Sequence, residues 1–385
     1  MKVLIAIDSF KGSLTSEMAG ESAKKGVLEI LPDAKCDIVL IGDGGEGTMH
    51  SLKMALGATE ITLKSTDPLG REIDAKYFAS EDCAIIDMCE CAGITLLSES
   101  ERKNADGQGN SAPMVASTYG VGTMIRHAVG LGYRNFLVGI GGSVTNDGGT
   151  GMLRALGFSL LDGDGKEIQG GAYGAGCVAK IDDIGVIAHL DECRFTVLCD
   201  VDNPLLGENG CSYIFSPQKG ASEGEIPVMD KYLSHFARMA GEYNPSADPS
   251  IAGSGAAGGI GFAFNTFLNS TLRRGVDVVS SAWELERRIS EADLVITGEG
   301  KMDSQSAHGK APIGVALLGK RHGKRVIAMC GITGDGYEKC YEKGIYRIYP
   351  IADPNKTLSE NMSPEIATQN MINATKQAIK EMYLK

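Results

Sequence analysis

Short clusters of carboxylates, glycines and hydroxyls follow the predicted strands of this chain. The clusters occupy residues 8–13, 42–48, 141–149, 200–204, 298–306 and 331–336. Glycines let backbone N–H groups approach an anion closely, and the start of a following helix adds a favourable dipole. Carboxylates at the same edge can hold Mg²⁺ or accept a proton from an attacking hydroxyl, and lysines can neutralise phosphate groups. These are the groups that phosphoryl transfer requires, because its catalysis is mostly positioning and charge stabilisation.

Each cluster also has a simpler structural explanation. An Asp at a strand end is often only a helix cap or the start of an Asx turn, and glycines after a strand commonly form a tight turn. Lys310 taken alone is typical of a solvated surface lysine. The occurrence of six similar clusters, all at predicted strand ends, favours a binding or catalytic site.

Both ends of the chain alternate between strand and helix patterns. Apolar, β-branched runs predict strands at residues 2–7, 37–41, 293–297, 325–330 and 346–351. Ser363, Pro364 and Glu365 predict the start of a last helix. Such alternation indicates a parallel sheet with both faces covered, whose ligands bind beyond the carboxyl ends of the strands.

The middle of the chain has a different pattern. Residues 60–87 alternate between apolar and polar positions around a DPLG turn, which indicates a hairpin. We therefore expect an α/β protein with a discontinuous Rossmann-like domain, residues 1–60 and 275–385. A mixed α/β domain, residues 61–274, is inserted into it, and we expect the active site in the cleft between the two domains.

Composition excludes several classes of protein. The 385 residues carry 37 Lys and Arg against 49 Asp and Glu, a formal net charge of −12, and without a basic run this argues against nucleic-acid binding. No apolar run reaches the roughly 18 residues of a membrane span. Asp8 and Lys11 interrupt the apolar start of the chain, so we expect no secretory signal and a cytoplasmic location. The ten cysteines form no C-x-x-C motif, which indicates neither a zinc site nor a redox pair.

Familiar nucleotide motifs do not fit. Residues 253–258 match G-x-G-x-x-G, but ADPSIA precedes them in place of a strand, which disfavours a dehydrogenase. Gly309 and Lys310 look like the end of a P-loop, but Ser304 and Ala311 break that pattern. A G-x-S-x-G elbow is absent from the sequence.

Nine strings of the chain resemble, in the same order, those of the type 1 glycerate kinases. They are DSFKGSLTS (8–16), GDGGEGT (42–48), DPLGR (67–71), TYGVGTMI (118–125), GGSVTNDGGTGMLRALG (141–157), CDVDNPLLGENG (199–210), PQKGA (217–221), GSGAAGGIGF (253–262) and TGEGKMDSQSAHGKAPIGVA (297–316). The resemblance covers nearly the whole chain. It implies a Rossmann-like domain with a second α/β domain, and ATP-dependent phosphorylation of D-glycerate, generally to 2-phosphoglycerate.

The resemblance and the strand-end positions together suggest roles. The expected substrate-binding residues are Asp8, Ser9, Asp43, Gly44, Ser143 and Asn146. The expected nucleotide-binding residues are Gly298, Gly300 and Lys310, and the expected Mg²⁺ ligands are Glu299 and Asp303. Asp200 is the candidate base for the glycerate hydroxyl, Asp147 is its rival, and Lys11 neutralises the glycerate carboxylate or the transferring phosphoryl group.

Two other functions stay open at the level of sequence. The chain could phosphorylate another small hydroxy acid or sugar acid. It could also be a non-catalytic sensor of sugar acids or nucleotides, although several carboxylates near one site favour turnover. In each case the expected partners are small molecules, with no nucleic acid and no membrane.

Overall fold

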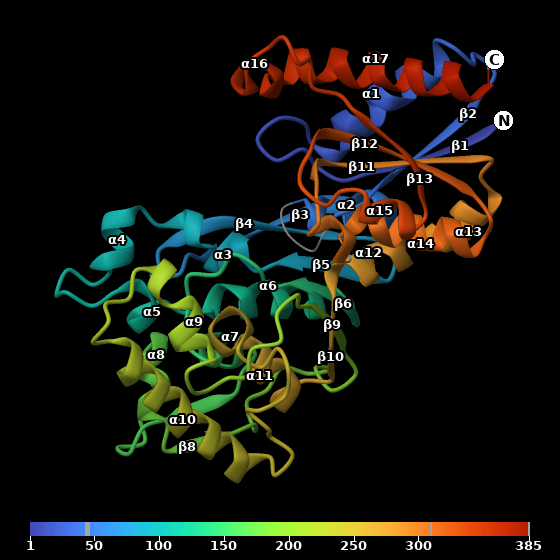
Figure 1. The fold of residues 1–385 in the computed structure, drawn as a ribbon. Helices are drawn as coiled ribbons and strands as arrows, with labels where there is room; N and C mark the ends of the chain where they lie inside the picture. Colours follow the sequence, from blue (N-terminus) through green and yellow to red (C-terminus); the bar gives the residue numbers. More distant parts are fainter. Residues whose placement is uncertain (43–46, 309, 384–385) are drawn as a thin grey trace. The chain divides into compact units, whose positions relative to one another are not determined.

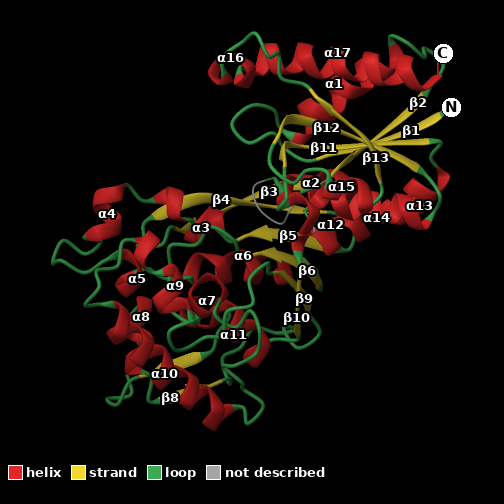
Figure 2. Ribbon diagram, in the orientation of Figure 1, coloured by secondary structure: helices red, strands yellow, loops and turns green. Residues whose placement is uncertain are grey.

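The computed structural model describes residues 1–42, 47–308 and 310–383 (Figure 1). Its contacts divide the chain into two compact units. Unit 1 comprises residues 1–56 and 275–385, and unit 2 comprises residues 57–274. Both units mix helices with strands, as the colouring by secondary structure shows (Figure 2), and the expected α/β class is confirmed.

Unit 1 is built on a parallel five-stranded sheet with the order β13-β12-β11-β1-β2. The strands are β1 (Lys2–Ile7), β2 (Lys35–Leu40), β11 (Leu294–Met302), β12 (Arg325–Thr333) and β13 (Ile345–Pro350). The helices are α1 (Ser16–Leu28), α2 (Thr48–Ala55), α12 (Gly275–Ala282), α13 (Leu285–Glu291), α14 (Ala311–Arg321), α15 (Lys339–Glu342), α16 (Leu358–Met362) and α17 (Pro364–Tyr383). The last helix begins at Pro364, as its N-terminal sequence predicts.

The helices of unit 1 cover both faces of this sheet. In β1, Val3, Ile5 and Ile7 point into a core shared with α1 and α17. Leu4 and Ala6 point into the opposite core, shared with α13 and α14. Figure 1 shows the same two layers, with α1 beside α17 on one side of the strands and α13 with α14 on the other. Alternation of fully buried side chains along a strand is what a sheet covered on both faces requires.

The connections of unit 1 create a switch point between β1 and β11. From β1 the chain passes through α1 to β2 on one side, and from β11 it passes through α14 to β12 on the other side. The two connecting helices lie on opposite faces of the sheet. A crevice therefore opens beyond the carboxyl ends of β1 and β11, which is where sheets of this kind bind ligands.

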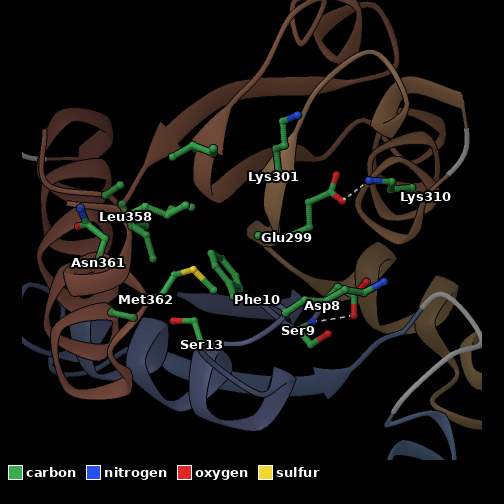
Figure 3. A pocket seen from close by; sticks show the side chains of 17 residues that line it. Asp8, Ser9, Phe10, Ser13, Glu299, Lys301, Lys310, Leu358, Asn361 and Met362 are labelled. Atoms are coloured by element: carbon green, nitrogen blue, oxygen red, sulfur yellow. Dashed lines mark hydrogen bonds and ion pairs between the residues drawn. The ribbon is translucent and has the colours of Figure 1, made fainter. Parts of the chain in front are cut away.

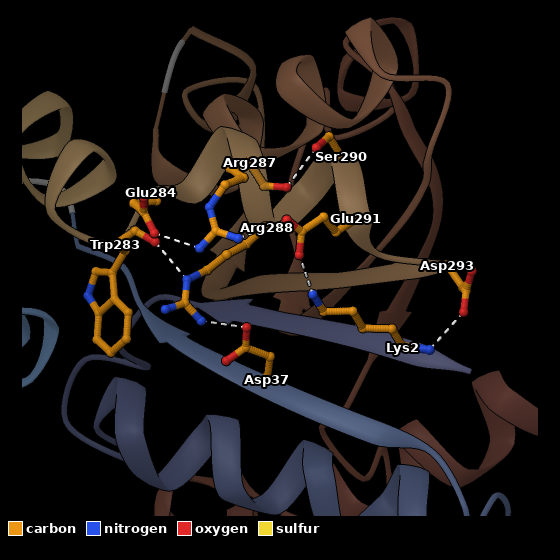
Figure 4. A network of polar contacts seen from close by, with 9 residues as sticks. All are labelled: Lys2, Asp37, Trp283, Glu284, Arg287, Arg288, Ser290, Glu291 and Asp293. Atoms are coloured by element: carbon orange, nitrogen blue, oxygen red, sulfur yellow. Dashed lines mark hydrogen bonds and ion pairs between the residues drawn. The ribbon is translucent and has the colours of Figure 1, made fainter.

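Charged side chains link α13 to the first residues of β1 and β2, at the end of the sheet opposite the switch point (Figure 4). Lys2 Nζ lies 2.6 Å from Glu291 Oε2, and the Arg288 guanidinium pairs with Asp37 of β2. The Arg288 guanidinium also lies 5.7 Å from the ring centre of Trp283. Because these groups are partly exposed, we assign them a role in orienting α13, with little contribution to stability.

Unit 2 is built on a six-stranded sheet with the order β10-β9-β6-β5-β4-β3. These strands are β3 (Thr59–Thr66), β4 (Glu72–Ala79), β5 (Cys83–Asp87), β6 (Asn135–Gly139), β9 (Arg194–Leu198) and β10 (Ser270–Arg273). From β5 to β10 the pairing is parallel, and β3, β4 and β5 are antiparallel, as the DPLG turn predicts. A small second sheet pairs β7 (Ser159–Leu161) with β8 (Lys180–Asp182).

The helices of unit 2 fill the rest of its fold. They are α3 (Cys89–Ala92), α4 (Glu99–Lys103), α5 (Ala112–Val115), α6 (Tyr119–Gly130), α7 (Thr150–Ala155), α8 (Gly171–Cys177), α9 (Cys211–Phe215), α10 (Ile226–Tyr243) and α11 (Ala256–Phe267). Within the described residues of the chain, none of the helices combines the length and the apolar character that crossing a membrane requires.

The glycine-rich run at the start of α11 serves packing inside unit 2. A Cβ on Gly258 would lie 2.1 Å from the Thr145 carbonyl oxygen, and the Gly258 oxygen accepts a hydrogen bond from Gly148 N at 2.9 Å. Only a residue without a side chain fits there, and its φ of +70° also favours glycine. This packing explains the G-x-G-x-x-G match without a dinucleotide.

Candidate active site

A pocket of about 300 Å³ lies at the switch point of unit 1 (Figure 3). Its polar end is formed by Asp8, Ser9, Lys11, Glu299, Lys301 and Lys310. Its opposite end is formed by Phe10, Leu358 and Met362, with Asn361 and Ser13 beside them, and Ile332 and Ile351 add apolar side chains to the lining. Figure 3 shows Lys310 and Glu299 on one side of the pocket, and Leu358 and Met362 on the other.

The turn after β1 places the first residues of the polar end. Asp8 N donates to the Gly298 carbonyl, which continues the β1–β11 pairing, and Asp8 Oδ1 accepts from Ser9 N at 2.6 Å. Phe10 N and the Leu14 carbonyl then close a tight turn at 2.8 Å, and Gly12 within it has a φ of +76°. Because Asp8 is 9% exposed and Phe10 is 4% exposed, this turn is held firmly against the sheet.

Strand β11 extends further than its sequence predicts. The sequence predicts a strand over residues 293–297, but β11 pairs with β12 as far as Met302 and Thr333. A Cβ on Gly298 would lie 2.2 Å from the Met329 carbonyl oxygen, and one on Gly331 would lie 2.3 Å from that of Gly300. The glycines therefore let the two strands approach closely, and the extension carries Glu299 into the pocket.

Glu299 forms an ion pair inside the pocket. Its side chain is 8% exposed, and Lys310 Nζ lies 3.2 Å from Oε2. Burial raises the pKa of this carboxyl, although Lys310 and the Ser306 hydroxyl act against that rise. The other oxygen, Oε1, is buried and has no hydrogen-bond partner among the residues that the structure describes. A buried carboxylate oxygen without a donor is costly, so a ligand that supplies positive charge would stabilise it.

Glu299 Oε1 fits a role as a Mg²⁺ ligand. Mg²⁺ prefers oxygen ligands, and it is usually held by one or two carboxylates together with water and substrate phosphates. Among the described residues, no group of three or more His, Cys, Asp or Glu side chains could hold a metal ion. A metal at Glu299 would therefore depend on phosphate oxygens of a bound nucleotide for much of its coordination.

Asp303, the second expected Mg²⁺ ligand, lies outside the lining that the described residues form around this pocket. Its Oδ1 accepts from Gln305 N at 2.9 Å, and its Oδ2 lies 3.2 Å from Lys301 Nζ. Both oxygens thus have partners within a turn. These contacts favour a structural role for Asp303, in the manner of an Asx turn.

The two glycines expected to bind the nucleotide differ in position. Gly300 lines the pocket, and a Cβ there would stay at least 3.4 Å from the nearest neighbours, Phe10 and Lys11. Gly298 is not among the lining residues, and the need for glycine there is explained by the close approach of the Met329 carbonyl oxygen. Of the substrate-binding residues expected in unit 1, Asp8 and Ser9 line the pocket, and Asp43 and Gly44 lie outside the described residues.

Asp147 in unit 2 has the contacts of a structural carboxylate. It is fully buried, and its oxygens accept four hydrogen bonds, from Thr118 N, Thr118 Oγ1, Gly149 N and Gly151 N. Burial raises the pKa of this carboxyl, and the four donors counteract the rise. Because its oxygens are already occupied, its position favours anchoring the start of α7 over proton transfer.

The other expected residues of unit 2 also follow its parallel strands. Asp200 comes after β9 and is exposed to solvent. Ser143 and Asn146 come after β6 and are buried, and Asn146 Nδ2 donates to Ser212 Oγ at 3.0 Å. The structure brings these residues to the carboxyl edge of the unit 2 sheet, as the strand-end argument predicts.

Lys219 is a residue of this edge that sequence reasoning missed. It is 2% exposed, and its Nζ donates to Ser143 Oγ at 2.9 Å and to the Thr145 carbonyl at 2.6 Å. Burial lowers its pKa from the ordinary 10.5 to about 8. Lys219 lies in PQKGA, one of the nine strings that resemble the family. A single lysine in a polar segment, however, does not indicate that its side chain is buried.

Fold and pocket together define a class of protein. A covered parallel sheet, with lysines and carboxylates gathered at its switch point, is typical of enzymes that bind nucleotides or phosphorylated ligands.

Comparison with known proteins narrows this class. The sequence model of the glycerate kinase family matches residues 3–383, so the chain belongs to the glycerate kinase family and is a kinase. The glycerate 2-kinase of Escherichia coli K12 is 40% identical over 362 residues, which cover 94% of this chain and 93% of that protein. A glycerate kinase of Bacillus subtilis 168 is 40% identical over 91% of this chain and 90% of its own length.

A solved structure agrees with both relatives. A crystal structure from Salmonella typhimurium LT2, assigned there as a glycerate kinase 2, superposes with a TM-score of 0.87 at 36% identity. It covers all of this chain, which covers 98% of that one. The resemblance inferred from the nine sequence strings, and the assignment as a kinase, are confirmed.

Proposed function

We propose that the chain transfers the γ-phosphoryl group of ATP to the 2-hydroxyl of D-glycerate, giving ADP and 2-phosphoglycerate. The observation that carries this proposal is the pocket at the switch point of a member of this family, whose lining combines the lysines Lys11, Lys301 and Lys310 with the carboxylates of Asp8 and Glu299. The choice of the 2-hydroxyl is supported by the name of the Escherichia coli relative, glycerate 2-kinase.

The proposed roles follow from position and charge. Lys310, now paired with Glu299, would turn to nucleotide phosphates, and Lys11 would neutralise the glycerate carboxylate or the transferring group. Glu299 would hold Mg²⁺ through Oε1. When bound, Mg²⁺ neutralises charge on the phosphate oxygens during transfer.

The reaction forms one bond and breaks another. The 2-hydroxyl oxygen of glycerate bonds to the γ-phosphorus, and the bond from that phosphorus to the β–γ bridging oxygen breaks. The hydroxyl proton passes to a carboxylate, for which we retain Asp200 as the proposed base. Ser9, with its hydroxyl at the polar end of the pocket, is proposed to orient the substrate.

A regiochemical experiment tests the proposal. The protein is incubated with D-glycerate and MgATP, and enolase is then added without phosphoglycerate mutase. Prompt formation of phosphoenolpyruvate is expected, because enolase accepts the 2-phosphate. Release of ADP without phosphoenolpyruvate would mean the 3-phosphate. A panel of other hydroxy acids is then assayed with MgATP, and faster turnover of any of them than of D-glycerate would overturn the substrate assignment. Binding of ligands without release of ADP would mean that the protein is a sensor.

A further inference from the structure

The apolar end of the switch-point pocket has no use in binding glycerate or phosphate. All three carbons of glycerate carry oxygen, and a triphosphate is a chain of charged groups. Both require the lysines at the polar end of the pocket. The pocket nevertheless continues past Phe10 to the side chains of Leu358 and Met362 (Figure 3).

We propose that this apolar end binds the nucleobase of the nucleotide, a subsite that rests on the proposed use of ATP. A nucleobase is the part of the reactants with large flat faces of low polarity, and aliphatic and aromatic side chains are the surfaces that hold such faces. The pocket volume of about 300 Å³ lies at the lower end of the range for small-molecule sites, roughly 300–1,000 Å³.

Two exposed side chains on α16 provide independent support. Leu358 is 65% exposed and Met362 is 36% exposed, and both line the pocket. They are four residues apart on one helix, so they lie on the same face. Figure 3 shows both on the wall opposite Lys310, and Phe10 lies between them and Asp8. A base placed among them would cover apolar surface that is now exposed to water.

The wall formed by α16 is already in place. Thr357 and Glu360 form a capping box at its start. Asn361 joins the helix to the preceding loop, because its Oδ1 accepts from Asp353 N at 2.8 Å and its Nδ2 donates to the Asp353 carbonyl at 3.0 Å. On the other side, a Cβ on Gly12 would lie 3.0 Å from Met362 Cε, so the turn after β1 and α16 are in close contact.

The two ends of the pocket assign an orientation to the nucleotide. Its phosphates lie toward Lys310 and Glu299, near the proposed metal ligand, and its base lies toward α16. Leu358 is the most informative residue to change, because its high exposure means that a polar replacement does not disturb the core.

The test compares Leu358→Ser with a matched control, Leu317→Ser. Leu317 lies on α14, is 46% exposed, and is outside the lining of this pocket formed by the described residues. Binding of ADP and of inorganic tripolyphosphate, each with Mg²⁺, is measured by calorimetry on the full chain. Tripolyphosphate carries the charges of the nucleotide without its base.

We expect Leu358→Ser to weaken ADP binding about tenfold, because the base loses a buried apolar partner. Tripolyphosphate binding stays unchanged, Leu358→Met keeps most of the ADP affinity, and Leu317→Ser binds both ligands as the original chain does. Unchanged ADP binding in Leu358→Ser, or equal losses for ADP and tripolyphosphate, would overturn the subsite. If these expectations hold but D-glycerate is not phosphorylated, the proposed function fails and the nucleobase subsite stands.

Discussion

The buried Lys219 ammonium gives a prediction with a definite size and sign. Nζ has two hydrogen bonds, to Ser143 Oγ and the Thr145 carbonyl, and the charge of Asp147 opposes the effect of burial on its pKa only in part. Burial lowers its pKa from 10.5 to about 8. At 1.36 kcal/mol for each tenfold change, this drop means that the charged lysine destabilises the folded chain by about 3 kcal/mol at neutral pH.

The sign of the pH dependence follows from proton binding. Because the pKa of Lys219 is lower in the folded chain, the unfolded chain binds more protons between pH 8 and pH 10.5. The loss of folding stability that results from burying the charged lysine is therefore complete below pH 8, and it disappears as the pH rises to 10.5.

The substitution Lys219→Met removes the charge and leaves two buried acceptors without their donor, at a cost of roughly 2 kcal/mol together. At pH 7 we expect the variant to be as stable as the original chain, or about 1 kcal/mol more stable. At pH 10 we expect it to be less stable by about 1 to 2 kcal/mol, since the original chain no longer buries a charge.

Urea unfolding followed by far-UV circular dichroism at pH 7 and pH 10 measures this change of sign. The control is Lys166→Met, whose side chain is exposed and whose difference from the original chain should not vary with pH. If Lys219→Met lost 3 kcal/mol or more at pH 7, with the same loss at pH 10, an unrecognised partner would be compensating the charge and our reasoning would be wrong.

Four substitutions test the proposed roles of individual residues. Asp200→Asn should lower kcat at least 100-fold without changing the circular dichroism spectrum, and near-normal turnover would remove Asp200 as the base. Glu299→Gln should raise the Mg²⁺ concentration that half-saturates turnover at least tenfold; an unchanged Mg²⁺ titration would exclude it as a ligand. Lys11→Ala should raise KM for D-glycerate or lower kcat, and unaltered constants would place it outside the site. Asp147→Asn should lower the free energy of unfolding by about 3 kcal/mol, because four buried donors lose a carboxylate, whereas lost turnover in a fully stable variant would restore its catalytic role.

Much of the unit 1 site could be predicted from sequence. Parallel strands end at one edge of a sheet, so Asp8 and Glu299, which come just after the strands predicted at 2–7 and 293–297, were expected at the same edge. The structure places both in one pocket, together with Lys310. The α/β class followed from the same alternation of strands and helices.

Properties that depend on tertiary packing could not be predicted. Asp147 and Asp200 both come after a strand of the unit 2 sheet, but one accepts hydrogen bonds from four donors and the other is exposed. Gly298 resembled a turn residue, although the close approach of β12 is what requires it. Burial of Lys219 results from contacts with residues more than 70 positions away, and local sequence carries no signal of such contacts.

The pairing of β1 with β11 has a consequence for how this protein is made. Neighbours across this pair are 291 positions apart, as in the contact of Lys2 with Asp293, so the first strand leaves the ribosome long before its partner exists. At roughly 5–20 residues per second, synthesis of residues 57–274 takes roughly 10 to 40 s, while all strands of the unit 2 sheet become available. During this interval β1 and β2 have an unpaired apolar edge, a state prone to aggregation. The end of the chain that is made first therefore completes its fold last, after unit 2 has had time to form.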